Sequence, residues 1–265
     1  MSRRLRLDAE LVRRGLARSR DQAADLIAAG RVAVGGQRAS KPASQVTTDA
    51  AITVAQDGQE PDYVSRAGYK LAGALAAFDG LTVQGKRCLD AGASTGGFTD
   101  VLLRAGAKHV VAVDVGYGQL AWSLRSDDRV TVLDRVNVRS LTPEQVAPAP
   151  ELVVADLSFI SLRLVLPALV ACAAPGADFV VMVKPQFEVG RGQVRGGVVR
   201  EPALRAQAVA DVAAAAASLG LGVAGVTASP LPGPAGNVEY FLWLRRGAAA
   251  LDGDLLGHAI AAGPQ

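Results

Sequence analysis

One stretch decides the fold of this chain: Cys88-Leu89-Asp90-Ala91-Gly92-Ala93-Ser94-Thr95-Gly96-Gly97-Phe98. An apolar run ends at Asp90, small residues follow, and apolar positions with helical spacing resume in residues 99–103. The pattern predicts a strand, a glycine-rich turn and the start of a helix. Such a turn presents free backbone N–H groups and the positive end of the helix to a ligand at the carboxyl edge of a parallel sheet.

The spacing within the turn distinguishes between classes of ligand. A dinucleotide-binding fingerprint has the form G-x-G-x-x-G, whereas this turn has the form D-x-G-x-S-x-G-G and places Asp90 before the first glycine. A pyrophosphate is bound by backbone amides, but a cationic sulfonium with an amino acid end tolerates a nearby carboxylate. Asp90 therefore favours S-adenosylmethionine, and a tight turn without any ligand remains the alternative interpretation.

The composition is that of a globular chain with room for one full domain and a small one, since half of its 265 residues are hydrophobic. The net charge is only +3, so any contact with nucleic acid must use local charge. Cys88 and Cys172 form no CxxC motif, and there is no histidine cluster. We expect a reducing compartment, no disulfide and no metal site.

Membrane segments are not predicted. The N-terminal arginines are not followed by the apolar run of a signal peptide. Residues 164–174 are too short to cross a bilayer, and glycines divide residues 212–229 into a helix and a strand. We therefore expect a cytoplasmic protein without stable membrane association.

The first 60 residues are predicted to form a small basic domain. Residues 1–41 hold ten basic and four acidic residues, a local excess that is larger than the net charge of the whole chain. Ser19 and Gln22 have the spacing of a capping box before a second helix, and Gly35-Gly36 is typical of a hairpin turn. A charged, solvated helical unit without a ligand is the alternative.

The apolar and glycine spacing between Leu7 and Gly36, followed by Lys41-Pro42, resembles the small RNA-binding domain that is named after a small-subunit ribosomal protein. The resemblance implies that helical arginines and the hairpin edge lie along structured RNA. RNA contacts are therefore expected for Arg4, Arg6, Arg14, Arg18, Arg20, Arg31 and Lys41.

A polar segment, residues 55–62, leads into a linker that we place at residues 61–67. Ser65 is expected to cap the next helix, and Arg66 is added to the predicted RNA contacts. Lys70 lies about one turn inside this helix, where the helix dipole disfavours a cation. Lys70 is therefore either exposed and indifferent or placed for chemistry.

From residue 86 onward strand and helix patterns alternate, which predicts a parallel sheet that is covered on both faces. Four of its strands end on a charged residue, namely Asp90, Asp114, Asp156 and Lys184. Because carboxyl ends of parallel strands meet at one edge, these side chains should converge there. Asp114 is expected to accept from ribose hydroxyls, and Asn137 to contact an adenine.

The chain reverses direction near its C-terminus. Residues 222–226 and 238–244 are joined by a connection too short for a parallel crossover, so the last strand is predicted to be antiparallel, with Glu239 at the ligand edge. The basic loop 187–200 is either a lid whose Arg191 and Arg195 meet phosphates or a plain surface loop. Residues 248–265 are predicted to be a tail that frays.

Segments at residues 65–71, 89–98, 156–159, 183–187 and 238–240 resemble the FtsJ-type ribose 2'-O-methyltransferases. With the basic domain in front, residues 5–246 resemble the TlyA family of rRNA (cytidine-2'-O)-methyltransferases, which are also labelled hemolysins. This implies an α/β fold, a seven-stranded Rossmann-like sheet at residues 68–247 after a small α+β domain at residues 1–60. It also implies S-adenosylmethionine as donor and 16S and 23S rRNA in the ribosomal subunits as substrate.

The same resemblance implies the site residues. The catalytic tetrad is Lys70, Asp156, Lys184 and Glu239. The expected cofactor contacts are Asp90, Gly92, Ser94, Thr95, Gly96, Gly97, Phe98, Asp114, Asn137 and Asp156. Many FtsJ relatives have Ala-Pro-Gly-Gly at positions 94–97, so this chain is expected to hold the methionine end of the cofactor differently.

The chemistry of the residues agrees with this assignment. A ribose hydroxyl that attacks a sulfonium methyl needs alignment and a base. Neither histidine lies at the ligand edge, so a lysine must serve, and burial or a neighbouring cation must lower its pKa. We assign Lys184 as the base and Lys70 as the neighbour that orients the hydroxyl. Asp156 and Glu239 are assigned as acceptors that hold the lysines and the ribose.

Three other interpretations stay open. In the first, the basic domain is an RNA clamp, the sheet is degenerate and the chain is a non-catalytic ribosome assembly factor. In the second interpretation the chain is a membrane-lytic hemolysin, but the sequence shows neither a membrane span nor a long amphipathic basic helix. In the third it is an NAD-linked oxidoreductase, which the glycine spacing disfavours. A separate alternative for the four charged residues is that they form ordinary surface ion pairs. In the preferred interpretation the protein acts as a monomer.

Overall fold

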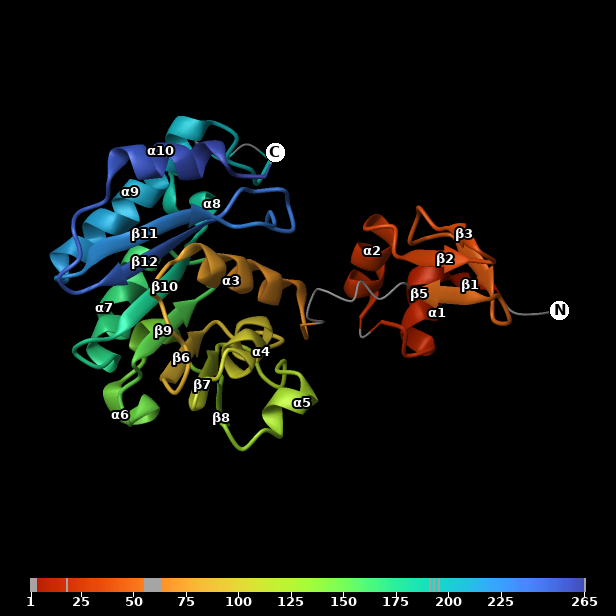
Figure 1. The fold of residues 1–265 in the computed structure, drawn as a ribbon, viewed down its shortest axis with the longest axis horizontal. Helices are drawn as coiled ribbons and strands as arrows, with labels where there is room; N and C mark the ends of the chain where they lie inside the picture. The colour runs from red at the N-terminus through yellow and green to blue at the C-terminus, as the bar shows by residue number, and fades with distance from the viewer. Residues whose placement is uncertain are drawn as a thin grey trace. The chain divides into compact units, whose positions relative to one another are not determined.

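The computed structural model describes residues 4–17, 19–54, 63–190, 192, 194 and 196–264. The chain divides into two compact units, Met1–Val64 and Ser65–Gln265. In Figure 1 the first unit is coloured red to orange, and the second runs from orange through green to blue.

The described part of the first unit combines two helices with short antiparallel strands. Strand β1 pairs with β4, and β2 lies between β3 and β5. The elements are β1 Arg4–Arg6, α1 Leu7–Arg13, α2 Arg20–Ala28, β2 Val32–Val34, β3 Gln37–Arg38, β4 Gln45–Thr47 and β5 Ile52–Val54. Ser19 accepts from the N–H of Gln22 at the start of α2, as expected. Gly35 and Gly36 both have positive φ, which the tight turn between β2 and β3 requires.

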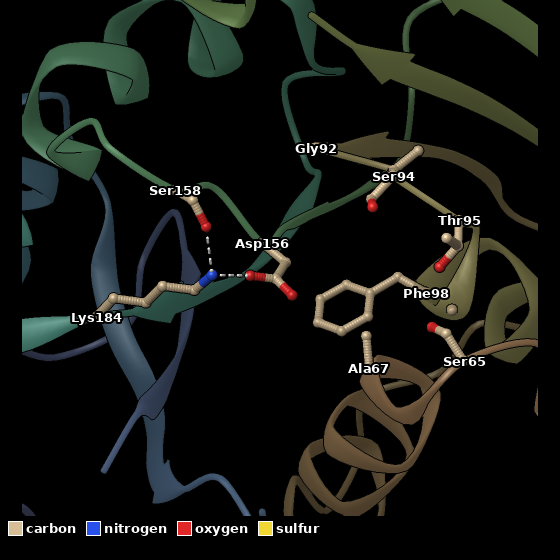
Figure 2. A pocket seen from close by; sticks show the side chains of 11 residues that line it. Ser65, Ala67, Gly92, Ser94, Thr95, Phe98, Asp156, Ser158 and Lys184 are labelled. Carbon is tan, nitrogen blue, oxygen red and sulfur yellow. Dashed lines mark hydrogen bonds and ion pairs between the residues drawn. The ribbon is translucent and has the colours of Figure 1, made fainter. Parts of the chain in front are cut away.

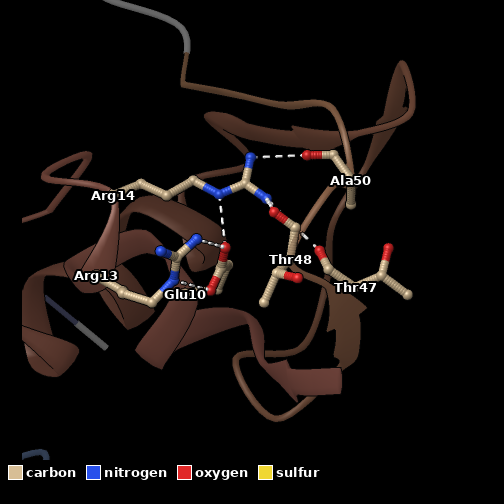
Figure 3. Close-up of polar contacts among 6 residues, drawn as sticks. All are labelled: Glu10, Arg13, Arg14, Thr47, Thr48 and Ala50. Atoms are coloured by element: carbon tan, nitrogen blue, oxygen red, sulfur yellow. Dashed lines mark hydrogen bonds and ion pairs between the residues drawn. The ribbon is translucent and has the colours of Figure 1, made fainter. Parts of the chain in front are cut away.

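A buried carboxylate ties this unit together (Figure 3). The Glu10 side chain is completely buried and accepts from the guanidinium groups of Arg13 and Arg14 at 2.6–2.7 Å. Arg14 also donates to the carbonyl of Ala50 at 2.7 Å and to that of Thr48 at 3.0 Å. Arg14 therefore connects helix α1 to the turn before β5.

The second unit is built on one sheet. Its seven described strands have the order β11-β12-β10-β9-β6-β7-β8, and all pair in parallel except β12, which is antiparallel to β10 and β11. The strands are β6 Arg87–Ala91, β7 His109–Asp114, β8 Val130–Asp134, β9 Leu152–Ala155, β10 Asp178–Val183, β11 Gly222–Ala228 and β12 Tyr240–Arg245. This is the predicted α/β sheet with a reversed last strand.

Helices cover both faces of this sheet (Figure 1). They are α3 Arg66–Ala77, α4 Gly97–Arg104, α5 Trp122–Arg125, the 3-10 helix Val138–Ser140, α6 Pro143–Val146, α7 Leu162–Cys172, α8 Pro185–Glu188, α9 Pro202–Ser218 and α10 Gly253–Ala261. Helices α7, α9 and α10 share one core with one face of the sheet. On the other face Phe98 of α4 lies 6.0 Å from Phe241, and Phe78 after α3 lies 5.8 Å from Trp243, measured between ring centroids.

Both cysteines are free and buried, and Cys172 belongs to the core beneath α7, α9 and α10. Burial raises the pKa of the Cys88 thiol to about 12 and also raises that of Cys172. Both thiols are therefore largely protonated at neutral pH.

Two boundaries differ from the sequence-based expectation. The prediction of a frayed tail is wrong, because residues 253–261 form α10, whose Ala259 is buried against the core. Leu256 and Ile260 pack against the same core, so apolar residues at helical spacing hold this helix in place. Helix α3 begins at Arg66, inside the segment predicted as a linker, and residues 55–62 lie outside the described residues.

No helix in the described ranges is both long enough and apolar enough to cross a membrane. The apolar segment at residues 164–174 lies largely in α7, which contains Pro167 and packs into the core.

The Glu10 network gives a first prediction. Glu10→Gln removes the charge that two arginines share in a buried position, which should cost the first unit about 3 kcal/mol. Hydrogen exchange of the α1 amides in the full chain should then be roughly a hundredfold faster. Asp25→Asn, an exposed change on α2, is the matched control and should leave these rates nearly unchanged. Equal rates in Glu10→Gln and Asp25→Asn would show that the network does not stabilise the unit.

Candidate active site

A pocket opens at the carboxyl edge of the sheet, beside the glycine-rich turn (Figure 2). Its walls come from the start of α3, the turn after β6, the segment after β9 and the end of β10. The lining residues are Ser65, Ala67, Gly92, Ala93, Ser94, Thr95, Gly97, Phe98, Asp156, Ser158 and Lys184. The stretch that decides the fold therefore also forms one side of the pocket.

Two glycines let the walls approach each other. Gly92 has φ +87°, and a Cβ there would collide with the backbone carbonyl of Asp156. A Cβ on Gly97 would collide with the Ser65 hydroxyl and come within 2.8 Å of the backbone N of Gly68. Larger residues at these positions would push the walls of the pocket apart.

Lys184 and Asp156 form an ion pair inside this pocket. The Lys184 Nζ lies 2.5 Å from Asp156 Oδ1 and donates to Ser158 Oγ at 3.0 Å. Figure 2 shows the three side chains meeting at the Lys184 amine. Both partners of the ion pair are mostly shielded from water, with side chains 11% and 18% exposed.

Lys70 and Glu239 form a second ion pair, with 2.5 Å between Nζ and Oε2. Both side chains are buried, at 8% and 1% exposed, and neither lines the pocket. Tyr240 pairs with Val183 in the sheet, so Glu239, one residue earlier, and Lys184, one residue later, end neighbouring strands at the same edge. The four tetrad residues thus lie at one edge as two ion pairs, and each lysine has a carboxylate partner.

The predicted cofactor residues fall into two groups. Gly92, Ser94, Thr95, Gly97, Phe98 and Asp156 line the pocket, whereas Asp90, Gly96, Asp114 and Asn137 do not. The Asp114 carboxylate accepts from the backbone N–H groups of Ser94 at 2.8 Å and Gly116 at 2.7 Å, so it supports the turn. Asn137 is exposed and accepts from the N–H of Arg139.

Asp90 lies beneath the turn and is completely buried. Its Oδ2 accepts from the Thr99 hydroxyl at 2.6 Å, while Oδ1 has no hydrogen-bond partner. Burial raises the pKa of Asp90 to about 7, and the charges of Asp156 and Asp114 add to this, although the Thr99 hydroxyl opposes it.

The residues predicted to contact RNA differ in exposure and in the interactions that their side chains already make. Arg4 and Lys41 are exposed. Arg6 and Arg20 are also largely exposed, and both bind the buried Asp8, at 2.8 and 3.0 Å. In the described chain, Arg14 is engaged by Glu10 and by backbone carbonyls, Arg31 has an interaction partner, and Arg66 donates to the Pro232 carbonyl at 3.2 Å. Arg18, Arg191 and Arg195 lie outside the described residues.

Ser65, Ala67 and Ser158 are pocket residues that our sequence-based site does not include. Each lies within a quoted motif, at residues 65–71 or 156–159, so proximity to tetrad members was an available signal. Ser65 was expected to cap α3. It occupies the N-cap position, but its hydroxyl makes no cap hydrogen bond and has no partner.

The role of Glu188 was also not predicted from the sequence. Its buried carboxylate accepts from the Ser161 hydroxyl at 2.5 Å and the Leu162 N–H at 2.7 Å, and so caps α7 from a distant segment. Next to it the Phe187 ring lies 5.3 Å from that of Phe159. These contacts bind the segment that follows Lys184 to the segment that follows Asp156.

No cluster of three or more metal-ligating side chains occurs within the described residues. The site presents two amines and two carboxylates beside a pocket with glycine-rich walls.

The burial of Asp90 predicts a pH dependence of stability. Its folded-state pKa is raised above the ordinary value of 3.8, so its contribution to stability is fully present below about pH 4 and is lost as the pH rises through about 7. From pH 4.5 to 7.5 the unfolding free energy of the ligand-free protein should fall by about 3 kcal/mol relative to Asp90→Asn. Urea titrations of both proteins across this range measure it. A constant difference between the two would contradict the prediction.

Comparison with known proteins agrees with the geometry. The model of the FtsJ-like methyltransferase family matches residues 63–246, and that of the S4 domain matches residues 5–52. A Mycobacterium tuberculosis protein named 16S/23S rRNA (cytidine-2'-O)-methyltransferase TlyA is 61% identical over 271 residues, covering 100% of both chains. Hemolysin A of Brachyspira hyodysenteriae is 39% identical over 89% of this chain and 98% of its own.

A solved structure from Streptococcus thermophilus, described as a hemolysin, is also similar. It has a TM-score of 0.77 and 39% sequence identity, and the match covers 98% of this chain and 96% of that one. On matches of this length and identity, the chain belongs to the FtsJ-like methyltransferase family and, within it, to the TlyA group.

Proposed function

We propose that this protein transfers a methyl group from S-adenosylmethionine to the ribose 2'-hydroxyl of a cytidine in ribosomal RNA. The observation that carries the proposal is the Lys184–Asp156 ion pair beside the Gly92 turn, which places the proposed base in the wall of the pocket. Since both ion pairs of the tetrad form within one chain, the enzyme is proposed to act as a monomer.

The pocket fits the proposed cofactor. Small residues of the turn allow close approach, Phe98 offers an apolar surface, and the buried Ser65 hydroxyl has no hydrogen-bond partner. Residues 92–98 and Asp156 would hold the methionine part, with Asp114 and Asn137 along the neighbouring strand ends. When bound, S-adenosylmethionine supplies an electrophilic methyl group on a positively charged sulfur.

The side chains divide the remaining work. The Lys184 amine takes the proton of the ribose 2'-hydroxyl as the hydroxyl oxygen forms its bond to the methyl carbon. Asp156 holds that amine at the pocket wall, 2.5 Å away. Lys70, which is paired with Glu239, is proposed to orient the hydroxyl. Most of the rate enhancement then comes from alignment of the oxygen with the methyl group.

Ribosomal RNA is proposed as substrate for two reasons. The Mycobacterium tuberculosis relative carries this activity in its name, on both 16S and 23S rRNA. The S4 domain match covers the part of the chain with excess arginine, and Arg4, Arg6, Arg20 and Lys41 are exposed on the first unit. Basic side chains on a surface bind phosphate through counterion release.

Replacing the proposed base tests the reaction. Lys184→Ala should lower kcat for methyl transfer to rRNA at least about a hundredfold, because a general base contributes at least that much. Transfer of a radiolabelled methyl group from S-adenosylmethionine measures it. The matched control is Lys86→Ala, which removes another lysine that is paired with β10, through Asp178 at 2.8 Å, but at the opposite edge of the sheet. Similar losses in both variants would contradict the assignment of the base.

The first unit gives a separate prediction about substrate binding. The double variant Arg4→Ala/Lys41→Ala should raise the Kd for rRNA about tenfold at 0.1 M salt and lower the salt dependence by about two charges. Filter binding over a range of salt concentrations measures both. Arg129→Ala, an exposed arginine that is paired with Asp127 in the second unit, is the control. Unchanged binding in the double variant would remove these two residues from the RNA surface.

A further inference from the structure

The Lys184 amine has two partners, and the second has no role in the mechanism above. Besides the ion pair with Asp156, the amine donates to Ser158 Oγ at 3.0 Å. Ser158 lies two residues beyond Asp156 and lines the same pocket. The intervening Leu157 packs against the core, so residues 156 and 158 project to one side, as in an extended chain. Figure 2 shows both oxygens reaching the amine.

The number of partners matters because a base must be neutral when it accepts a proton. A neutral amine carries two N–H groups and one lone pair in a tetrahedral arrangement. The Asp156 contact is an ion pair without hydrogen-bond geometry, because Asp156 Oδ1 has no hydrogen-bond partner, whereas Ser158 Oγ accepts one N–H in a directed bond. The carboxylate charge repels the lone pair from its side, so the lone pair has one remaining direction. We propose that Ser158 is a positioning residue that directs the lone pair of Lys184 toward the ribose hydroxyl. This inference rests on the proposed function, in which Lys184 is the base.

Asp156 alone does not fix this direction. The carboxylate attracts an N–H by charge, but rotation about the Cε–Nζ bond can bring either N–H to its side and so exchanges the second N–H with the lone pair. Half of the resulting arrangements present a hydrogen to the substrate oxygen instead of an acceptor. The Ser158 hydroxyl removes this ambiguity because it accepts the second N–H. Correct alignment of the base is the contribution that general base catalysis requires.

A purely structural role for Ser158 is disfavoured by its exposure. Ser158 is exposed at the pocket mouth, so removing its hydroxyl leaves no buried polar group without a partner. The buried polar group that stabilises this region is Glu188, which caps α7 by accepting from Ser161 and Leu162. Ser158→Ala should therefore shift the Tm by no more than about 2 °C.

The test separates kcat from KM in the full chain, with rRNA and S-adenosylmethionine as substrates. Ser158→Ala should lower kcat roughly tenfold, less than loss of the base itself, while KM for both substrates stays within about twofold. Ser158→Thr keeps a hydroxyl and should restore kcat to within about twofold of the wild type. Ser218→Ala, an exposed serine at the end of α9, should leave kcat and KM unchanged.

A double variant shows whether Ser158 acts through the lysine. In the Lys184→Ala background, Ser158→Ala should cause no further loss of rate. The inference is overturned if Ser158→Ala retains wild-type kcat, if KM rises in its place, if threonine does not rescue, or if the variant fails to fold. In each of these cases an active wild type and an inactive Lys184→Ala leave the proposed function standing. A wild type that transfers no methyl group to rRNA overturns the proposed function and this inference together.

Discussion

Parallel pairing of β6, β9 and β10 is the constraint on which the site depends. The hydrogen bonds of this ladder continue past the end of β9, where the Asp156 N–H donates to the Ala91 carbonyl at 3.0 Å. Backbone bonds therefore place the first carboxylate directly beside the glycine turn. Strand β12 runs antiparallel to β10, so its first residues lie at the same edge as the last residues of β10. Glu239 therefore reaches this edge, because it precedes Tyr240, which pairs with Val183. Strand geometry thus gathers groups that are far apart in the sequence.

The same constraint explains how much the sequence alone could reveal. Strand ends were predictable from apolar runs that stop at a charged residue, and so Asp156 and Lys184 were expected together. The contacts of Ser158 and Glu188 were not predictable, because each side chain meets its partners only in the folded structure, Ser158 at Lys184 and Glu188 at Ser161 and Leu162. Asp114 was predicted from its strand end, but the hydrogen bonds that its carboxylate accepts from the Ser94 and Gly116 N–H groups could not be predicted in the same way. The spacing of apolar and charged residues in the sequence predicts which side chains lie at the carboxyl edge of the sheet. Their hydrogen-bond partners at that edge depend on tertiary packing.

Charge in the first unit shows another limit of sequence reasoning. A count of arginines assumes that each one is available to RNA. The guanidinium of Arg14, however, donates to Glu10 and to backbone carbonyls of residues 47–50. Hydrogen bonds from Arg13, together with those from Arg14, outweigh burial and lower the pKa of Glu10 to about 2, so this carboxylate stays ionised in the interior. Part of the basic excess therefore holds the unit together. Only the arginines that remain on its surface can contribute to a field that attracts phosphate.

The two cysteines have a practical consequence. Both are buried, and a thiol whose pKa is raised to about 12, like that of Cys88, has almost no thiolate at neutral pH. Alkylating reagents and mild oxidants should therefore leave the native protein unmodified. A single cysteine introduced on the surface of either unit would become the one fast-reacting handle for a maleimide dye, so fluorescent labels can be attached without first removing any native residue.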